Sequence, residues 1–240
     1  ALRGMADASA APGGRSGPPG PATPPRSTAR PARARRRPRA QLLPPVALAN
    51  AIEASVHQCS RALIEELKLV IPPASSVLAS AGRDGKPPLL AVPTAQRTEA
   101  DLTEWGDRAA KEKDDCLERF AAWARCVCDQ LLALGHWADF IDPCSGHPML
   151  AEGRGAVFSE VDCFASMLRY PVADAGGCRI VLHPAWGSRF YPATMFTTAP
   201  LRVLVRAVAV AAGGEPAGDK DPWLLAAAEG TAPDHQDPDA

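Results

Sequence analysis

The chain has 240 residues, of which 46% are hydrophobic, and a formal net charge of −1. This balance gives its central part no electrostatic basis for binding nucleic acid, and no apolar run reaches the roughly 18 to 20 residues that a membrane-spanning helix needs. Seven cysteines and no recognisable signal peptide favour a reducing compartment over a disulfide framework.

The charges are unevenly distributed along the chain. Residues 1–48 hold nine arginines, ten of the 25 prolines and one acid, and they have almost no apolar residue larger than alanine before Leu42. Residues 213–240 hold seven acids and one lysine, with Gly and Pro scattered among them. Such compositions cannot offset the entropy of ordering the chain. We therefore expect a disordered leader over 1–48, one domain over 49–212 and a disordered acidic tail over 213–240.

The arginine-rich run 30–39 has three interpretations: a nucleic-acid patch, a nuclear signal, or part of a mitochondrial transit segment. A transit segment or a merely disordered leader fits better, because Ser and Thr lie nearby and acids are almost absent.

Residues 47–69 have a helical pattern that ends at Pro72. Its apolar residues recur at spacings of three and four, which places them on one face of a helix. They are Ile52, Val56, Cys59, Leu63 and Leu67. The run 89–92 then predicts a short buried strand.

A second, long helix is expected from a cap at Thr98 or Thr103 to Gly135. Its apolar stripe consists of Leu102, Trp105, Ala109, Cys116, Phe120, Trp123, Val127, Leu131 and Leu134. A strand over 137–141 follows, closed by a turn over 142–146.

The remaining elements are short, and no regular βαβ alternation occurs, so we predict an α+β fold. We expect a strand over 158–161, a helix over 162–168, and two strands over 180–182 and 190–197 that pair as a hairpin across 184–188. The apolar stretch 201–212 has no assigned role.

The stretch around Cys178 has the strongest candidate chemistry. Gly176 and Gly177 precede the cysteine, and an apolar run follows it. Because glycine lacks a Cβ, a partner or ligand could approach this thiol closely. The alternative is a buried cysteine that acts as a small hydrophobe at a strand end.

Two catalytic or metal-binding alternatives remain open. Two cysteine–histidine pairs have the spacing of the two halves of a zinc site: Cys144 with His147, and Cys178 with His183. A nucleophilic Cys178 would instead need a histidine and a carboxylate; the candidates are His183 or His136, with Asp139, Asp142 or Asp162. The domain contains no nucleophile elbow, phosphate-binding loop or dinucleotide fingerprint, so the case for an enzyme is thin.

Several strings together resemble the family of cobalamin-trafficking proteins of methylmalonic aciduria and homocystinuria type D, the cblD family. The longest is Trp137-Ala-Asp-Phe-Ile-Asp-Pro143. The others, in order, are His57-Gln-Cys59, Ser145-Gly146, Asp174, Gly176, Cys178, His183, Trp186-Gly187 and Phe196-Thr197. The resemblance covers roughly residues 49–200.

This resemblance implies a modified flavin-nitroreductase fold and a non-enzymatic adaptor. The adaptor would bind the cobalamin-loaded cblC-type processing protein and direct the cofactor to methionine synthase and methylmalonyl-CoA mutase, in the cytoplasm and the mitochondrion. Cobalamin would be shared transiently, with Cys178 as candidate cobalt ligand, Gly176 and Gly177 beside it, and His183 and Trp186 as candidate partner contacts. A flavin-dependent oxidoreductase and a zinc-structured interaction module are the alternatives.

The chain departs from the resemblance at one informative position. The family pattern is Gly-Cys-Cys, whereas this chain has Gly176-Gly177-Cys178. Its single cysteine matches the second cysteine of the pair, so Cys178 is the ligand only if it replaces the first. Cys144 and His147 stand where the pattern has a serine and an apolar residue, which argues against zinc.

Overall fold

The computed structural model describes residues 41–213 except 49 and 154, and these form one α+β domain, as predicted. Most of the predicted leader and nearly all of the predicted acidic tail lie outside the described residues. The sheet begins earlier than expected, however, because Gln41–Ala47 forms strand β1 within the segment assigned to the leader.

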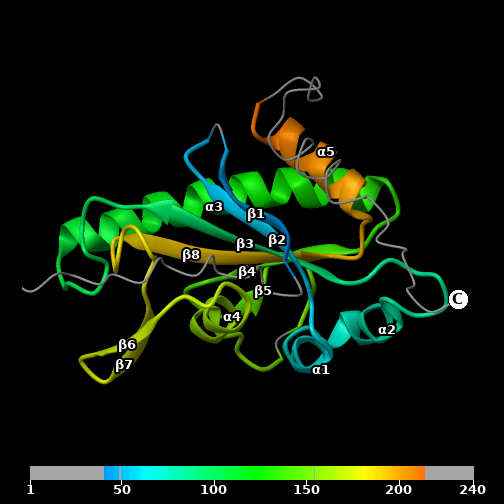
Figure 1. Cartoon of the computed structure of the whole chain (residues 1–240), viewed down its shortest axis with the longest axis horizontal. Helices are drawn as coiled ribbons and strands as arrows, with labels where there is room; N and C mark the ends of the chain where they lie inside the picture. The colour runs from blue at the N-terminus through cyan, green and yellow to red at the C-terminus, as the bar shows by residue number, and fades with distance from the viewer. Residues whose placement is uncertain (1–40, 49, 154, 214–240) are drawn as a thin grey trace, which may run out of the picture. The chain divides into compact units, whose positions relative to one another are not determined.

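A six-stranded antiparallel sheet runs through the centre of the domain, in the order β1-β2-β3-β8-β4-β5 (Figure 1). Strands β3 and β8 form its middle and are paired over their full length, from Leu90↔Thr197 to Arg97↔Phe190. The other strands are shorter. The bounds are β2 Glu53–Gln58, β3 Leu90–Arg97, β4 Ala138–Asp142, β5 His147–Pro148 and β8 Phe190–Thr197.

Two helices, α3 (Asp107–Ala133) and α5 (Leu201–Ala211), cover one face of the sheet, which we call the upper face (Figure 1). The buried residues of α3 recur every three or four positions and pack onto alternate residues of the strands. Examples are Phe120 and Val127 of α3 against Phe140 of β4 and Met195 of β8. The stretch without an assigned role is thus α5, which contributes Leu204 and Val208 to the same core.

Helices α1 (Arg61–Val70), α2 (Ser75–Ser80) and α4 (Glu160–Met167), with the short helix η1 (Pro72–Ala74), cover the opposite, lower face. Ser60 caps α1 by accepting the N–H of Leu63, and Ser159 caps α4 by accepting the N–H of Asp162. The lower face is divided into two apolar clusters, one beneath α1 and α2 and a smaller one around Phe164 and Phe190.

The helix predicted over 47–69 was wrong in its first half. Residues Glu53–Gln58 form β2, and only Arg61–Val70 is helical. Ile52 and Val56 are buried as predicted, but Val56 packs as a strand residue, with Ala54 beside it on the upper face. Ser55 and His57 are also buried, so this strand lacks the alternation of polar and apolar residues that would identify it.

The long helix has the predicted end but not the predicted start. It begins after Gly106, without a side-chain cap, rather than at Thr98 or Thr103. The residues before it form a loop, in which Trp105 is fully exposed instead of belonging to the apolar stripe.

The hairpin predicted between 180–182 and 190–197 was also wrong. The strand that starts at Cys178 is β7 (Cys178–Val181), and it pairs with β6 (Val172–Ala175) in a separate two-stranded sheet. Strand β8 pairs instead with β3 and β4. No strand forms at 158–161; Glu160 already begins α4.

None of the helices within the described ranges is both long enough and apolar enough to pass through a bilayer.

Candidate functional site

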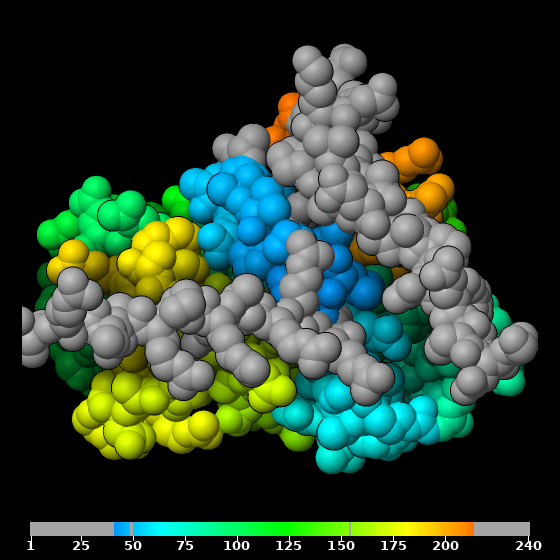
Figure 2. All heavy atoms as spheres, viewed as in Figure 1, coloured from blue at the N-terminus to red at the C-terminus, as the bar shows by residue number. Residues whose placement is uncertain are grey.

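The hairpin of β6 and β7 presents the candidate site. It projects at the periphery of the described domain, beside α4 (Figures 1 and 2). Ala175 pairs with Cys178, so Gly176 and Gly177 form a two-residue turn. Their φ angles of 57° and 90° are both positive, as a type I′ turn requires and as glycine adopts without strain. No described atom lies within 4 Å of a Cβ placed on either glycine, so the tip is open to approach.

Cys178 is exposed at the first position of β7. It borders a hollow of about 640 Å³, which we call the outer hollow, between the hairpin and residues 102–106. Trp105, Lys113 and Ile180 also line this hollow. The thiol is therefore accessible, and an exposed aromatic ring and an ammonium group line the same hollow. The buried alternative for Cys178 was wrong.

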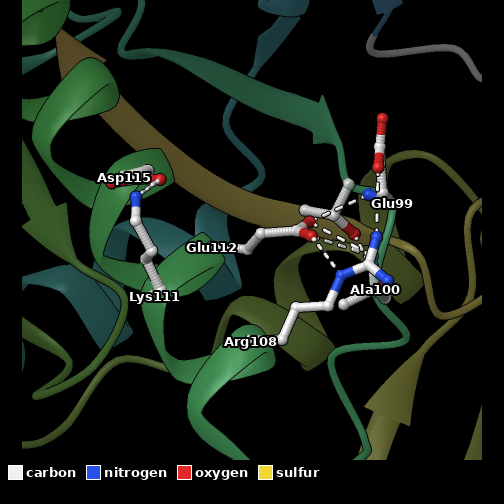
Figure 3. A network of polar contacts seen from close by, with 7 residues as sticks. Glu99, Ala100, Arg108, Lys111, Glu112 and Asp115 are labelled. Carbon is white, nitrogen blue, oxygen red and sulfur yellow. Dashed lines mark hydrogen bonds and ion pairs between the residues drawn. The ribbon is translucent and has the colours of Figure 1, made fainter.

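A group of hydrogen bonds and ion pairs, which we call the first clamp, fixes residues 99–100 to α3 (Figure 3). These residues begin the loop that lines the outer hollow. The carboxylate of Glu112 accepts the backbone N–H groups of Glu99 and Ala100 at 2.8 and 3.1 Å. Arg108 joins the two acids, since its guanidinium lies 3.0 Å from Glu99 and 3.6 Å from Glu112. One helical turn of α3 thus fixes the start of the loop that ends at Trp105.

A second clamp joins this loop to residues 183–189. The carboxylate of Asp101 accepts hydrogen bonds from the N–H and hydroxyl of Thr103 and from the hydroxyl of Ser188, the last at 2.6 Å. These bonds, chiefly that from Ser188, lower the pKa of Asp101. Two segments far apart in the sequence are therefore held together next to the hairpin.

His183 and Trp186 belong to a closed loop rather than to the hairpin tip. His183 is buried, and its ring stacks on Trp186 with centroids 3.8 Å apart and planes at 12°. Its Nδ1 accepts the N–H of Ala185 at 3.2 Å, which leaves Nε2 to donate to Glu53 at 3.1 Å. The role of His183 visible in the structure is to fix this loop to β2. A partner contact by the half-buried Trp186 stays a prediction.

Neither of the two alternative sites, the zinc site and the catalytic arrangement of Cys178 with His183 and a carboxylate, forms among the described residues. No group of three or more potential metal-ligating side chains forms within them, so the two halves of the imitated zinc site are not brought together. Both ring nitrogens of His183 have partners other than the thiol. Asp162 pairs with Arg179 at 2.9 Å.

The carboxylates of the two other acids considered for a catalytic role accept hydrogen bonds within turns. The carboxylate of Asp139 accepts four backbone N–H groups, those of Phe140, Met149, Leu150 and Ala151. Asp142 accepts from Cys144 and Ser145, as expected for the predicted turn. Neither carboxylate is available to orient a histidine.

Sequence reasoning missed two features of this region. Trp105 was assigned to a buried stripe, although the Gly106 that follows it was a signal for a helix start. Glu160 was not singled out at all, yet it is buried beneath the hairpin and hydrogen-bonds to Thr194 of β8. Its position directly after a serine cap predicts a helix N-terminus but not burial, which depends on a strand 34 residues further on.

A protein-family model matches most of the described domain. The family model described as methylmalonic aciduria and homocystinuria type D protein matches residues 35–207, which include the sheet, the hairpin and both clamps. The chain belongs to this family.

Curated relatives share the same region. The chain is 30% identical over 148 residues to the cobalamin trafficking protein CblD of Homo sapiens, and 28% identical over the same length to that of Mus musculus. Each alignment covers 62% of this chain and 47% of the relative. The chain therefore spans about half the length of the curated relatives that it matches.

Proposed function

We propose that the chain acts in cobalamin trafficking by presenting Cys178 as a ligand for the cobalt of cobalamin carried by a cblC-type protein. The observation that carries the proposal is the exposed thiol at the open end of the β6–β7 hairpin. A thiolate is a soft ligand suited to an axial position on cobalt. Coordination would form a cobalt–sulfur bond as the thiol proton leaves to water, and at handover this bond would break and the thiolate would take up a proton from water.

The turn geometry supports Cys178 in place of the first cysteine of the family pattern. In this chain that first position is Gly177, a turn residue with a φ of 90°. A side chain at such an angle is strained, whereas the first residue of a strand has an ordinary backbone conformation. Cys178 is held by its pairing with Ala175, so its thiol direction is better fixed than that of a turn residue.

The role proposed for the chain is that of an adaptor and not of an enzyme. Its partners would be the cblC-type protein and, downstream, methionine synthase and methylmalonyl-CoA mutase, in the cytoplasm and the mitochondrion. Support comes from the relatives, which are named as trafficking proteins, and from His183, whose ring nitrogens are both occupied, one by Ala185 of its own loop and the other by Glu53 of β2.

The decisive experiment is an absorbance titration of the full chain into a cobalamin-loaded cblC-type protein. We expect the cobalamin spectrum to shift with the wild-type chain and not with Cys178→Ser. Cys126→Ser is the matched control, because Cys126 is also exposed but lies on α3. It is expected to behave as wild type.

The outcomes separate the parts of the proposal. Complex formation by gel filtration without a spectral shift would keep the adaptor and remove the thiolate from its mechanism. A shift that persists in Cys178→Ser would assign the ligand elsewhere, and no complex at all would reject the adaptor.

We also propose that the fold is related to that of flavin nitroreductases and that the chain lacks their activity. An antiparallel sheet with helices on both faces supports the relationship at the level of architecture. The purified chain is expected to contain no flavin and to oxidise no nicotinamide cofactor. Flavin absorbance that copurifies with the chain would favour the oxidoreductase alternative instead.

A further inference from the structure

A second space lies on the other side of the hairpin and adjoins the outer hollow, with which it shares Leu102, Thr103, Lys113 and Ile180. This inner cavity has a volume of about 490 Å³ and extends between β7, the start of α4 and the beginning of β8. Its walls are mainly apolar, with Phe158, Val161, Ile180, Val181 and Phe190 among them. The volume falls within the range of small-molecule sites in proteins, about 300 to 1,000 Å³.

One acid lines the inner cavity, and its carboxyl group is incompletely satisfied. Glu160 is more than nine-tenths buried, and its Oε2 accepts the hydroxyl of Thr194 at 2.6 Å. Its Oε1 is buried without a hydrogen-bond partner among the described residues. Since buried polar groups are nearly always paired, an unpaired carboxyl oxygen at an apolar cavity is the feature expected of a ligand-binding group.

The environment of Glu160 sets its protonation. Burial raises the pKa of this carboxyl to about 7, although the hydrogen bond from Thr194 opposes the shift. Its neighbour Cys163, one turn along α4, has a pKa raised well above the usual value by burial, and burial likewise raises that of Tyr191, which lines the cavity from β8. Glu160 therefore changes charge near neutral pH while these two groups stay protonated.

Two cationic side chains complete the lining. Lys113 comes from α3 and Arg179 from β7. Arg179 already pairs with Asp162, whereas Lys113 forms no ion pair within the part of the chain that the structure describes. Lys113 also lines the outer hollow. With Glu160 neutral, the charged side chains that line the cavity are both cationic, and the ammonium group of Lys113 favours an anion beside it.

We propose that the inner cavity binds a small amphipathic acid. Its apolar body would pack against Phe158, Val161 and Phe190, its anionic group would pair with Lys113, and a further polar atom would hydrogen-bond to Glu160. This site is separate from the cobalamin role proposed for Cys178. The two are neighbours, however, because an occupant would contact Ile180 and Val181 of the strand that begins with the exposed thiol.

The test uses the full chain with no partner and no cobalamin, so it is independent of the proposed function. The probe is anilinonaphthalene sulfonate (ANS), which combines aromatic rings with an anion and becomes fluorescent in apolar sites. We expect saturable binding by the folded chain. Octanoate should displace the dye and octanol should not, because only the former supplies the anionic group.

Two variants locate the probe. Lys113→Glu should weaken ANS binding by roughly tenfold, because it reverses the charge that pairs with the anion. Lys111→Glu is the matched control, since Lys111 is an exposed lysine on the same helix that does not line the cavity. It should change the affinity by less than about twofold. Val161→Trp, which fills the inner cavity at a residue that does not line the outer hollow, should abolish binding, with circular dichroism verifying that the variant folds.

A pH series tests the contribution of Glu160. Between about pH 6 and about pH 8 the wild-type affinity for ANS should fall by roughly tenfold, as the ionised carboxylate comes to oppose the anion. Glu160→Gln should remove this dependence. Absence of saturable binding, an unchanged affinity in Lys113→Glu or in Val161→Trp, or the same pH dependence in Glu160→Gln would each overturn the proposal.

Discussion

The two faces of the sheet differ in what they bury. Beneath α3 and α5, the upper face holds one continuous apolar cluster that extends from Leu43 to Val208. The lower face has two smaller clusters and buries the acids Glu160 and Asp139, whereas the buried polar residue Gln96 of the upper face donates to the carbonyl of Cys116 on α3. Apolar burial of the upper kind is the main source of stability, whereas buried polar groups cost free energy unless they are paired. The largest apolar cluster therefore lies on the upper face, and the two buried acids lie on the lower face.

His57 shows what the polar groups of the lower face experience. Burial lowers its pKa to about 4, so the imidazole is neutral at physiological pH. Its Nε2 lies 3.0 Å from the hydroxyl of Ser55 on the same strand. Burial thus keeps this polar side chain in its neutral form.

The largest effect is expected from a truncation on the upper face. Phe120→Ala should lower the free energy of unfolding by about 3 to 5 kcal/mol, because it leaves a cavity between Trp123 and Phe140. Urea denaturation measures the loss, and Phe120→Leu should lose less than half as much. A smaller loss than that of the lower-face variants would contradict the division between the faces.

Removal of one lower-face acid should have the next largest effect. Asp139→Ala leaves the four backbone N–H groups that this carboxylate accepts without their acceptor, which should cost about 3 kcal/mol. Asp139→Asn keeps one acceptor oxygen and should fall between wild type and Asp139→Ala. Equal stability of the alanine variant and the wild type would show that residues 149–151 do not depend on this side chain.

The contribution of Glu160 on the lower face to the free energy of unfolding is expected to depend on pH. Because its pKa is raised to about 7 in the folded chain, its contribution to stability is complete below the unfolded value of 4.5 and is lost as the pH rises through 7. Between about pH 5 and about pH 8, wild type should therefore lose about 2.5 kcal/mol relative to Glu160→Gln. Denaturation at a series of pH values measures this difference, and parallel curves for the two proteins would contradict it.

The smallest expected effect concerns the helix ends. Both α1 and α4 on the lower face have serine caps, whereas α3 and α5 have no side-chain cap. Ser60→Ala should cost about 1 kcal/mol, because the N–H of Leu63 loses its acceptor. Ser60→Asp should retain most of the stability. An unaffected midpoint for Ser60→Ala in thermal unfolding would show that packing alone fixes α1.

The elements with a strong local signal were predictable from the sequence. The apolar stripe and the final Gly135 predicted most of α3, and the run 137–141 predicted β4. Strand β2 was not recognised, because Ser55 and His57 are buried along with Ala54 and Val56, and the apolar positions then fit a helix equally well. The partner of β7 was missed for a different reason: β6 consists of Val-Ala-Asp-Ala, which has no strand signal of its own.

The candidate site could be predicted only in part. The glycine pair and the thiol were visible in the sequence because they are adjacent. The clamps of Glu112 and Asp101 join residues up to 87 positions apart, and the burial of Glu160 depends on Thr194. Such contacts follow from the tertiary fold and leave no local pattern.

Both margins of the main sheet contain proline. The outer strand β1 includes Pro44 and Pro45, where its register with β2 shifts, and the opposite outer strand, β5, consists of His147 and Pro148. Proline has no N–H to offer to an incoming strand, so these margins are poor templates for backbone pairing between molecules. The main sheet is thereby disfavoured as a site of edge-to-edge pairing, whereas the two proline-free strands of the β6–β7 hairpin pair only with each other among the described residues.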